Sequence, residues 1–185
     1  IGRHLRTDIY GLKAEPRSLL IPRQYRYDVT ERIRADGSVE TPLDEAQVGD
    51  LARRMMDAGI EAVAVCYLHA YRNFDHERRT AEILAKAAPG LRVSLSHRVS
   101  PEMREFERTS TTVLNAVLMP VVGAYLERIE RRLADTGIAA TLYLVQSNGG
   151  VTTPAVAAEQ PARLLLSGPS GGAMAISTVC RCGCR

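Results

Sequence analysis

An apolar run, a helix and a second apolar run, in that order, constrain this chain more than any other feature. Residues 62–68 read Ala-Val-Ala-Val-Cys-Tyr-Leu, which is typical of a strand covered on both faces. A helix is predicted over residues 76–88, Pro89-Gly90 stops it, and residues 91–95 form the next strand. This spacing predicts a right-handed crossover between two parallel strands. The pattern therefore predicts the α/β class.

Before this unit the sequence predicts a hairpin and a helix. Residues 25–34 resemble a strand, and a turn at residues 35–37 leads into a short return strand. Asp44 is a good N-cap for an amphipathic helix that reaches about Ala58, and Gly59 closes that helix.

After this unit the sequence predicts a long helix and two further strands. The helix begins near Pro101 and is interrupted at Pro120, because proline removes a backbone donor and clashes with the preceding turn. It then continues to about residue 135. The strands are predicted over residues 141–146 and 163–166, and each runs into a glycine-rich turn.

Composition and charge limit the classes of protein. Apolar residues make up 45% of the 185 residues and charged residues 24%, the balance of a globular protein. The formal net charge of +3 is too small for an obvious nucleic-acid binder. No stretch consists of the roughly 18 apolar residues that a membrane span requires, and the first residues lack a signal-peptide pattern. We therefore expect a cytoplasmic chain that binds neither nucleic acid nor membrane.

The cysteines and histidines do not predict a metal site. Cys66 lies inside the apolar run and reads as a small buried hydrophobe. His69 and His76 flank a strand-to-helix loop without the fixed spacing of a helical metal pair, so we expect structural roles. Three more cysteines alternate near the end of the chain without the two-residue gap of zinc knuckles, and their role stays open: Cys180, Cys182 and Cys184.

Two glycine-rich segments are candidates for binding an anion. The first follows the strand at 141–146, and the second follows the strand at 163–166 and precedes a small-residue helix that begins at about residue 172. In α/β sheets ligands bind beyond the carboxyl ends of strands. Glycines allow close approach of the backbone, and a following helix offers unpaired N–H groups. The candidate residues are Ser147, Asn148, Gly149 and Gly150 in the first segment, and Ser167, Gly168, Pro169, Gly171 and Gly172 in the second.

A third candidate is the charged segment over residues 100–112. On a helix Arg104 and Arg108 share one face, which suits a bidentate clamp for an anion, and Thr111 is a further candidate contact. The alternative is a surface helix held by ion pairs. Both interpretations stay open at this point.

Together these segments resemble the hydantoinase A / 5-oxoprolinase family, which includes the β subunit of acetone carboxylase. The match runs nearly from end to end. Its most specific parts are Glu-Arg-Thr-Ser-Thr-Thr-Val-Leu-Asn-Ala at 107–116, Gln-Ser-Asn-Gly-Gly at 146–150 and Leu-Ser-Gly-Pro-Ser-Gly-Gly at 166–172.

The resemblance implies a partial actin-like ATPase fold of the ribonuclease H type, with a mixed sheet and crossover helices. It also implies ATP and Mg²⁺ as cofactors. Family members activate an amide or ketone carbonyl, usually by phosphorylating its oxygen, and then open a cyclic amide such as 5-oxoproline or a hydantoin, or carboxylate acetone. Many work with a hydantoinase B-type subunit. The site residues that the resemblance implies are those of the two glycine-rich segments; it names no catalytic residue.

We therefore expect an internal fragment of an ATP-dependent cyclic amidohydrolase. Residues 1–98 would be the C-terminal part of the family's N-terminal domain, and residues 99–185 the start of its hydantoinase A domain. The family's two Asp/Gly-rich phosphate hairpins do not occur in this sequence, so we expect the 185 residues alone not to hydrolyse ATP. The alternatives are an acetone-carboxylase-like subunit and a non-catalytic module that binds a B-type subunit.

Overall fold

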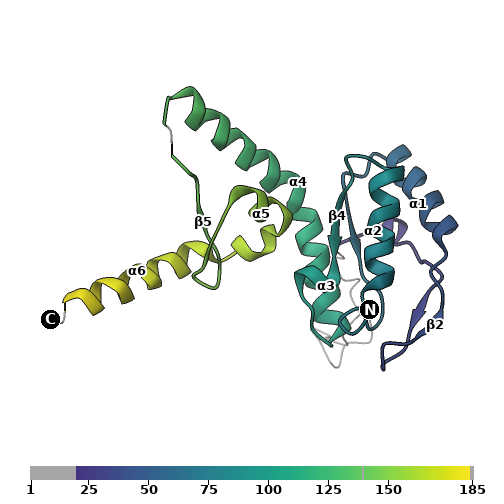
Figure 1. Cartoon of the computed structure of the whole chain (residues 1–185). Helices are drawn as coiled ribbons and strands as arrows, with labels where there is room; N and C mark the ends of the chain where they lie inside the picture. Colours follow the sequence, from purple (N-terminus) through teal and green to yellow (C-terminus); the bar gives the residue numbers. More distant parts are fainter. Residues whose placement is uncertain (1–19, 139, 184–185) are drawn as a thin grey trace, which may run out of the picture.

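The computed structural model describes residues 20–138 and 140–183. Its centre is a parallel pair of strands, β3 (Ala62–Val65) and β4 (Arg92–Leu95), in register from Ala62 opposite Arg92 to Val65 opposite Leu95. Helix α2 (Asp75–Ala87) joins the two strands, which confirms the predicted crossover unit. Figure 1 shows β4 between α2 on one side and α4 on the other.

Helix α1 (Glu45–Asp57) packs against α2, and its ends match the sequence prediction. The Asp44 carboxylate accepts a hydrogen bond from the Gln47 N–H, which satisfies an otherwise unpaired donor of the first turn. Gly59 follows the helix with a φ of +66°, a conformation that glycine adopts without strain. The apolar faces of α1, α2, β3 and β4 form the core: Val48, Leu51, Ala52, Met55, Val65, Leu84, Ala88 and Leu95.

The predicted hairpin is present, but its first strand is much shorter than predicted. Strand β1 (Arg32–Ile33) pairs antiparallel with β2 (Val39–Thr41), and Gly37 takes the turn with a φ of +92°. Tyr25, the first residue of the predicted strand, ends a 3₁₀ turn, η1 (Arg23–Tyr25), and residues 26–31 have no regular secondary structure. Tyr27 and Val29 pack against the core without a strand partner. The alternation of apolar and polar residues in this segment therefore reflects burial of every second side chain and not strand pairing.

A short helix and a long one follow β4. Helix α3 (Ser96–Val99) was not predicted, and α4 (Glu105–Asp135) begins four residues later than predicted, with Arg104 as its N-cap. The predicted interruption at Pro120 is wrong. Helix α4 stays continuous because residues on both sides of the proline are buried: Ala116 and Met119 before it, and Gly123 and Leu126 after it.

Helix α4 is also long and apolar enough to cross a membrane by length and composition, with a mean hydropathy of 1.3 over its most apolar window. That window includes polar residues, which the sequence prediction counted against a span. Core helices share these properties, and here α4 packs on β3 and β4. Thr112 and Asn115 are fully buried on this helix.

The last third of the chain departs most from prediction. Strands β5 (Leu144–Val145) and β6 (Val151–Thr152) form a small antiparallel hairpin, and α5 (Pro154–Glu159) follows. The predicted strand at 163–166 is wrong: η2 (Pro161–Leu164) is a 3₁₀ helix that begins at a proline, and Leu165 and Leu166 are exposed. Helix α6 (Ser167–Gly183) begins at once, so residues 167–172 form helical turns and not the predicted loop.

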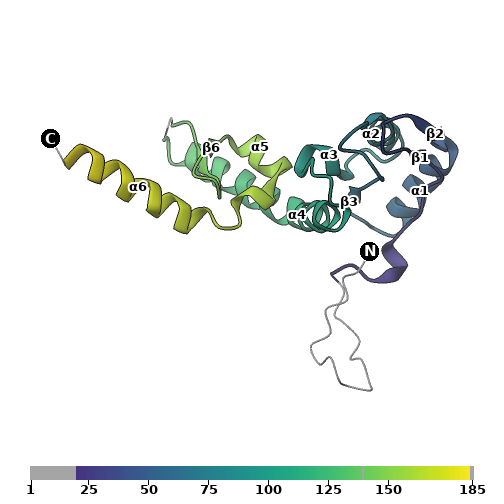
Figure 2. The ribbon, with the colours of Figure 1, turned by 90° about the horizontal axis from the view of Figure 1, so that it is seen from below.

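The α/β class is confirmed, but the predicted mixed sheet is not what the described residues form. They contain three separate two-stranded sheets, one parallel and two antiparallel. Figure 2 shows the resulting elongated shape, with α1, α2 and the β1–β2 hairpin at one end, α4 in the middle and α6 at the other end. The actin-like fold stays a prediction.

Candidate functional site

The first glycine-rich segment is the turn of the β5–β6 hairpin. The Gln146 N–H donates to the Gly150 carbonyl at 2.7 Å, and the Gly149 N–H donates to the Gln146 carbonyl at 3.0 Å. The Asn148 side-chain oxygen accepts from the Gly150 N–H at 2.9 Å, and Gly149 has a φ of +83°. An Asn side chain that bonds the backbone two residues on, followed by a glycine with positive φ, forms a tight turn. Local sequence therefore determines this half of the site.

Ser147 joins this turn to the second segment. Its N–H and its hydroxyl both donate to the Arg163 carbonyl, each at 2.7 Å. The same hydroxyl accepts from the Leu166 N–H at 3.1 Å, directly before α6 begins. One serine thus fixes the hairpin turn to the start of the helix.

Helix α6 packs along the hairpin at two glycines. A side chain at Gly149 would meet the Met174 side chain at 3.0 Å, and one at Gly171 would meet Val145 at 3.6 Å. At Gly149 the Met174 side chain would have to move to admit a Cβ, and the φ of +83° also favours glycine. The structure therefore brings together the two segments that the sequence offered as separate candidates, and the second of them is a helix.

The grouped residues suit an anionic ligand. Ser147, Asn148, Gly150, Gly168, Pro169 and Gly172 are exposed, and Ser167 and Gly171 are half-buried. The first N–H groups of a helix have no partner within it, and the helix dipole places positive charge there. Among the described residues no group of three His, Cys, Asp or Glu side chains could hold a metal ion.

The predicted arginine clamp is not assembled. Arg104 is exposed at the N-cap of α4, whereas the Arg108 side chain is buried, with 1% of the residue exposed. Arg108 donates to the Glu102 carbonyl at 2.7 Å and to the Tyr67 carbonyl at 3.0 Å, and it lies over the Tyr71 ring. The Thr111 hydroxyl donates to the Glu107 carbonyl within the helix. Arg108 therefore connects α4 to the residues that follow β3 through buried hydrogen bonds. Neither the anion clamp nor the surface ion pairs considered from the sequence anticipated this role.

A buried carboxylate lies at the carboxyl ends of both central strands. Glu77 has no exposed surface, and it accepts hydrogen bonds from the Tyr67 N–H, the Ser96 hydroxyl and the His97 N–H. The His97 ring nitrogen Nδ1 lies 2.7 Å from the same carboxylate, and the Phe74 ring stacks on the imidazole. Several donors on one buried carboxylate compensate for its lost hydration. The sequence gives no signal for this role of Glu77.

The two histidines that we expected to be structural have structural contacts. The Nδ1 atom of His69 lies 2.8 Å from the Ile33 carbonyl oxygen, and that of His76 lies 2.8 Å from the Glu31 carboxylate. Both contacts attach the β1 region to the loop and helix that follow β3.

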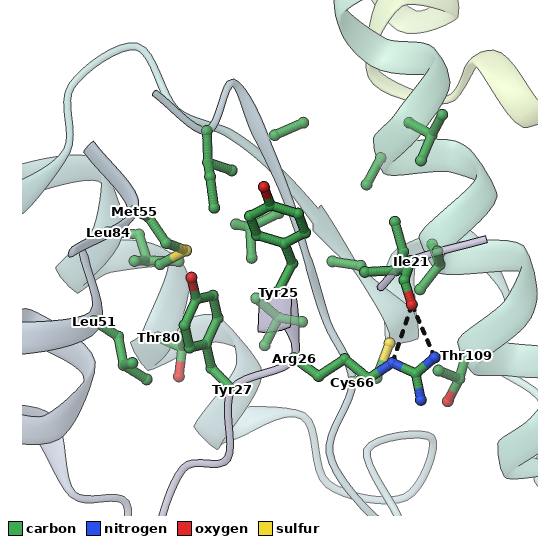
Figure 3. Close-up of a pocket in the computed structure, with 18 of the residues that line it drawn as sticks. Ile21, Tyr25, Arg26, Tyr27, Leu51, Met55, Cys66, Thr80, Leu84 and Thr109 are labelled. Carbon is green, nitrogen blue, oxygen red and sulfur yellow. Dashed lines mark hydrogen bonds between the residues drawn. The ribbon is translucent and has the colours of Figure 1, made fainter. Parts of the chain in front are cut away.

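An apolar cleft of about 910 Å³ lies beside β3, bounded by α1, α4 and the segment that begins at Leu20. Figure 3 shows Tyr25, Tyr27 and Cys66 around it. Cys66 was predicted to be a small buried hydrophobe; it is half-buried and lines this cleft, where burial raises the pKa of its thiol to about 12. Cys180 is a free, exposed cysteine, and Cys184 lies outside the described residues.

Two family models match this chain in sequence order. The hydantoinase/oxoprolinase N-terminal region matches residues 1–88, and the hydantoinase/oxoprolinase model matches residues 108–182. The chain belongs to the hydantoinase/oxoprolinase family. The domain boundary predicted at residue 98 falls between the two matched regions and stays a prediction.

The relatives of this hydantoinase/oxoprolinase chain are named for different substrates. It is 36% identical to the caprolactamase subunit alpha of Pseudomonas jessenii over 90% of its length and 24% of the relative's. It is 34% identical to the 5-oxoprolinase of Saccharomyces cerevisiae over 74% of its length and 10% of the relative's.

Solved structures support the same family fold. The crystal structure of the ATP-dependent caprolactamase from Pseudomonas jessenii superimposes with a TM-score of 0.79 at 37% identity, over 87% of this chain and 23% of that one. The nucleotide-free structure of acetone carboxylase gives a TM-score of 0.73 at 27% identity, over 90% of this chain and 24% of that one. The chain thus spans about a quarter or less of the length of the relatives it matches.

Within the family motif at residues 107–116, sequence reasoning missed a buried polar face. Arg108, Thr112 and Asn115 follow one another at helical spacing on α4, and each is essentially unexposed. Four hydroxyl residues in a row are poor helix formers, and this was the available signal that packing, and not propensity, keeps them there.

Proposed function

We propose that this chain forms part of an ATP-dependent enzyme that opens a cyclic amide, with the two grouped glycine-rich segments contacting the phosphates of the nucleotide. The observation that carries the proposal is the joining of residues 146–150 to the start of α6 through Ser147. Both the caprolactamase and the 5-oxoprolinase among its relatives are named for cyclic amides, which supports that substrate class.

Each part of the grouped segments has a distinct task in this proposal. The backbone N–H groups of Ser167 and Gly168 and the Ser167 hydroxyl would bind phosphate oxygens, as helix N-termini commonly do. Pro169 has no N–H, and the Ser170 N–H donates to the Leu166 carbonyl. The turn at residues 146–150 would present the Asn148 side chain beside them. Gly168 and Gly172 leave open space around the backbone, so a ligand can approach closely.

The chemistry requires such an arrangement because an amide is a poor electrophile. ATP with Mg²⁺ would supply a phosphoryl group to the carbonyl oxygen, and the protein's part is to position the reactants and stabilise charge. In this chain Ser147 holds the turn and the helix start in one geometry, and the first N–H groups of α6 would offer the charge stabilisation.

The test is ATP-dependent phosphate release by the intact protein, with Mg²⁺ and a panel of 5-oxoproline, a hydantoin and caprolactam. We expect release that depends on one of these cyclic amides, and a reduction of about tenfold or more in kcat/KM for Ser147→Ala. Thr136→Ala, at an exposed hydroxyl at the end of α4, is the control and should leave the rate unchanged. Phosphate release that no cyclic amide stimulates would contradict the proposal.

A second candidate is carboxylation of a ketone. The similarity to acetone carboxylase, at a TM-score of 0.73, favours it, and phosphate release stimulated by acetone with bicarbonate would identify it. Relatives named as subunits also support a proposed partner subunit of the hydantoinase B type. Co-purification with that subunit in the absence of nucleotide binding would instead favour the non-catalytic module.

A further inference from the structure

The side chain of Asn115 connects three parts of the chain that lie far apart in sequence. Its Nδ2 group donates to the Ser94 hydroxyl of β4 and to the Glu159 carbonyl at the end of α5, each at 3.0 Å. Its Oδ1 atom accepts from the Ala162 N–H of η2 at 3.1 Å. Both amide protons are therefore used, and the residue is fully buried.

This set of contacts continues on both sides of Asn115. Toward the sheet, the Ser94 hydroxyl donates to the Thr112 carbonyl at 3.2 Å and has only 2% of its surface exposed. Toward the candidate site, Ala162 is bonded covalently to Arg163, whose carbonyl accepts both hydrogen bonds from Ser147. A single peptide unit thus separates the Asn115 contact from the turn at residues 146–150.

We infer that Asn115 is a positioning residue that fixes the turn at residues 146–150 and the start of α6 relative to the central strands. The effect of this positioning on nucleotide binding rests on the proposed function, whereas the positioning itself does not. Without the amide, the Glu159 carbonyl and the Ala162 N–H would each lose this buried partner. These two bonds hold the segment from Glu159 to η2 on α4, so without them η2 would shift and the Ser147 contacts would shift with it.

The test compares two buried polar substitutions on the same face of α4. Asn115→Ala removes the whole connection. Thr112→Val removes a buried hydroxyl one turn earlier, whose bond goes to the Arg108 carbonyl of its own helix, and leaves every contact of Asn115 in place. Amide hydrogen exchange of Ser147 and Leu166 in the intact protein reports the position of the turn without any ligand.

We expect the Ser147 and Leu166 amides to exchange about tenfold faster in Asn115→Ala, and at the wild-type rate in Thr112→Val. Amides of β3 and β4 should be unchanged in both. Equal acceleration at all sites, or none at Ser147, would overturn the inference. If Asn115→Ala does not fold, Ser94→Ala removes the anchor of Asn115 on β4, together with the hydroxyl's own bond to the Thr112 carbonyl, and leaves the Asn115 contacts to Glu159 and Ala162 in place. It should accelerate the same two amides by about threefold, and no acceleration there would overturn the inference.

Binding of ATP with Mg²⁺ separates this inference from the proposed function. If the wild type binds ATP, we expect Asn115→Ala to weaken binding about tenfold and Thr112→Val to leave it unchanged. An intact protein that binds no ATP but shows the local exchange pattern would refute the proposed site and retain the positioning role. Unchanged ATP affinity together with wild-type exchange in Asn115→Ala would refute the positioning role alone.

Discussion

Glu77 shows how a single residue can organise the end of a parallel strand pair. Its carboxylate accepts from a backbone N–H after β3 and from the first residues of α3 after β4. Because the carboxylate is fully buried, these donors and the His97 ring beside them take the place of water around it. The residue therefore holds together the loops that follow the two strands.

Replacing Glu77 with Leu should lower the free energy of unfolding by about 3 kcal/mol, because several buried donors lose their acceptor. Urea denaturation measures the loss. Glu82→Leu is the matched control on the same helix, where an exposed carboxylate pairs with Arg79, and it should cost less than about 1 kcal/mol. Similar losses for the two variants would refute the assigned role of Glu77.

Cys66 and Tyr67 predict how stability depends on alkaline pH. Burial raises the pKa of the thiol from about 9 to about 12 and that of the phenol from about 10 to about 12. Both groups are almost entirely neutral in either state at about pH 8 and below. Above it they ionise first in the unfolded chain, so stability falls as pH rises from about 9 to about 12.

Between pH 8 and pH 10, Cys66→Ala should therefore lose about 1 kcal/mol less of its free energy of unfolding than the wild type does. Urea denaturation at the two pH values measures this difference. In the native wild type, Cys66 should also resist alkylation at pH 8 while the exposed Cys180 reacts. An identical pH dependence in wild type and variant would contradict the burial argument.

At the scale of elements, the second glycine-rich segment shows that glycines do not by themselves make a loop. Gly168, Gly171 and Gly172 lie inside α6, where glycine costs about 1 kcal/mol relative to alanine. At Gly149, in contrast, glycine is favoured by the structure, because the residue has a positive φ and lies close to the Met174 side chain.

These two environments predict opposite effects of the same substitution. Gly149→Ala should destabilise the chain by about 1–2 kcal/mol, because the added Cβ is strained and meets the Met174 side chain. Gly168→Ala should be neutral or stabilise by up to about 1 kcal/mol, since nothing lies within 4 Å of the added atom. Thermal unfolding measures both. A destabilising Gly168→Ala would indicate that residues 167–172 are not helical.

Element prediction succeeded where the signal was local. The Asp44 cap lies three residues from the donor that it binds, and the crossover unit is specified by apolar runs around one helix. It failed where partners were distant: the Leu-rich segment at 163–166 has strand composition, but the turn that begins at Pro161 and the bond from Ser147 fix it differently.

At the scale of the whole molecule, the described structure has an open apolar side. Residues from α1, β3, α4 and the segment before Tyr27 line the 910 Å³ cleft, and Arg26 is the one charged residue among the lining residues. Cavities of this size with mostly apolar walls bind apolar ligands. The arrangement follows from a parallel sheet that contains only two strands among the described residues.

The isolated chain should therefore enhance the fluorescence of 1-anilinonaphthalene-8-sulfonate while its circular dichroism stays that of a folded protein. Val117→Glu places a charge on the lining of the cleft and should reduce the enhancement at least about twofold. Val121→Glu is the control, because Val121 is exposed on the same helix and does not line the cleft. No enhancement in the wild type would contradict an accessible cleft.

The crossover unit, the ends of α1, the tight turn at residues 146–150 and the family could all be predicted from sequence, because each depends on residues close together in the chain or on a motif in a fixed order. The roles of Glu77, Arg108 and Asn115 became visible only in the folded chain. Each of the three has a partner far away in the chain, at 19, 41 and 44 residues respectively, and no local pattern specifies such contacts. The start of α4 reads in the sequence as a charged surface helix, but Arg108, Thr112 and Asn115 are buried there. A polar group removed from water needs a hydrogen-bond partner, and that partner can come from any part of the fold.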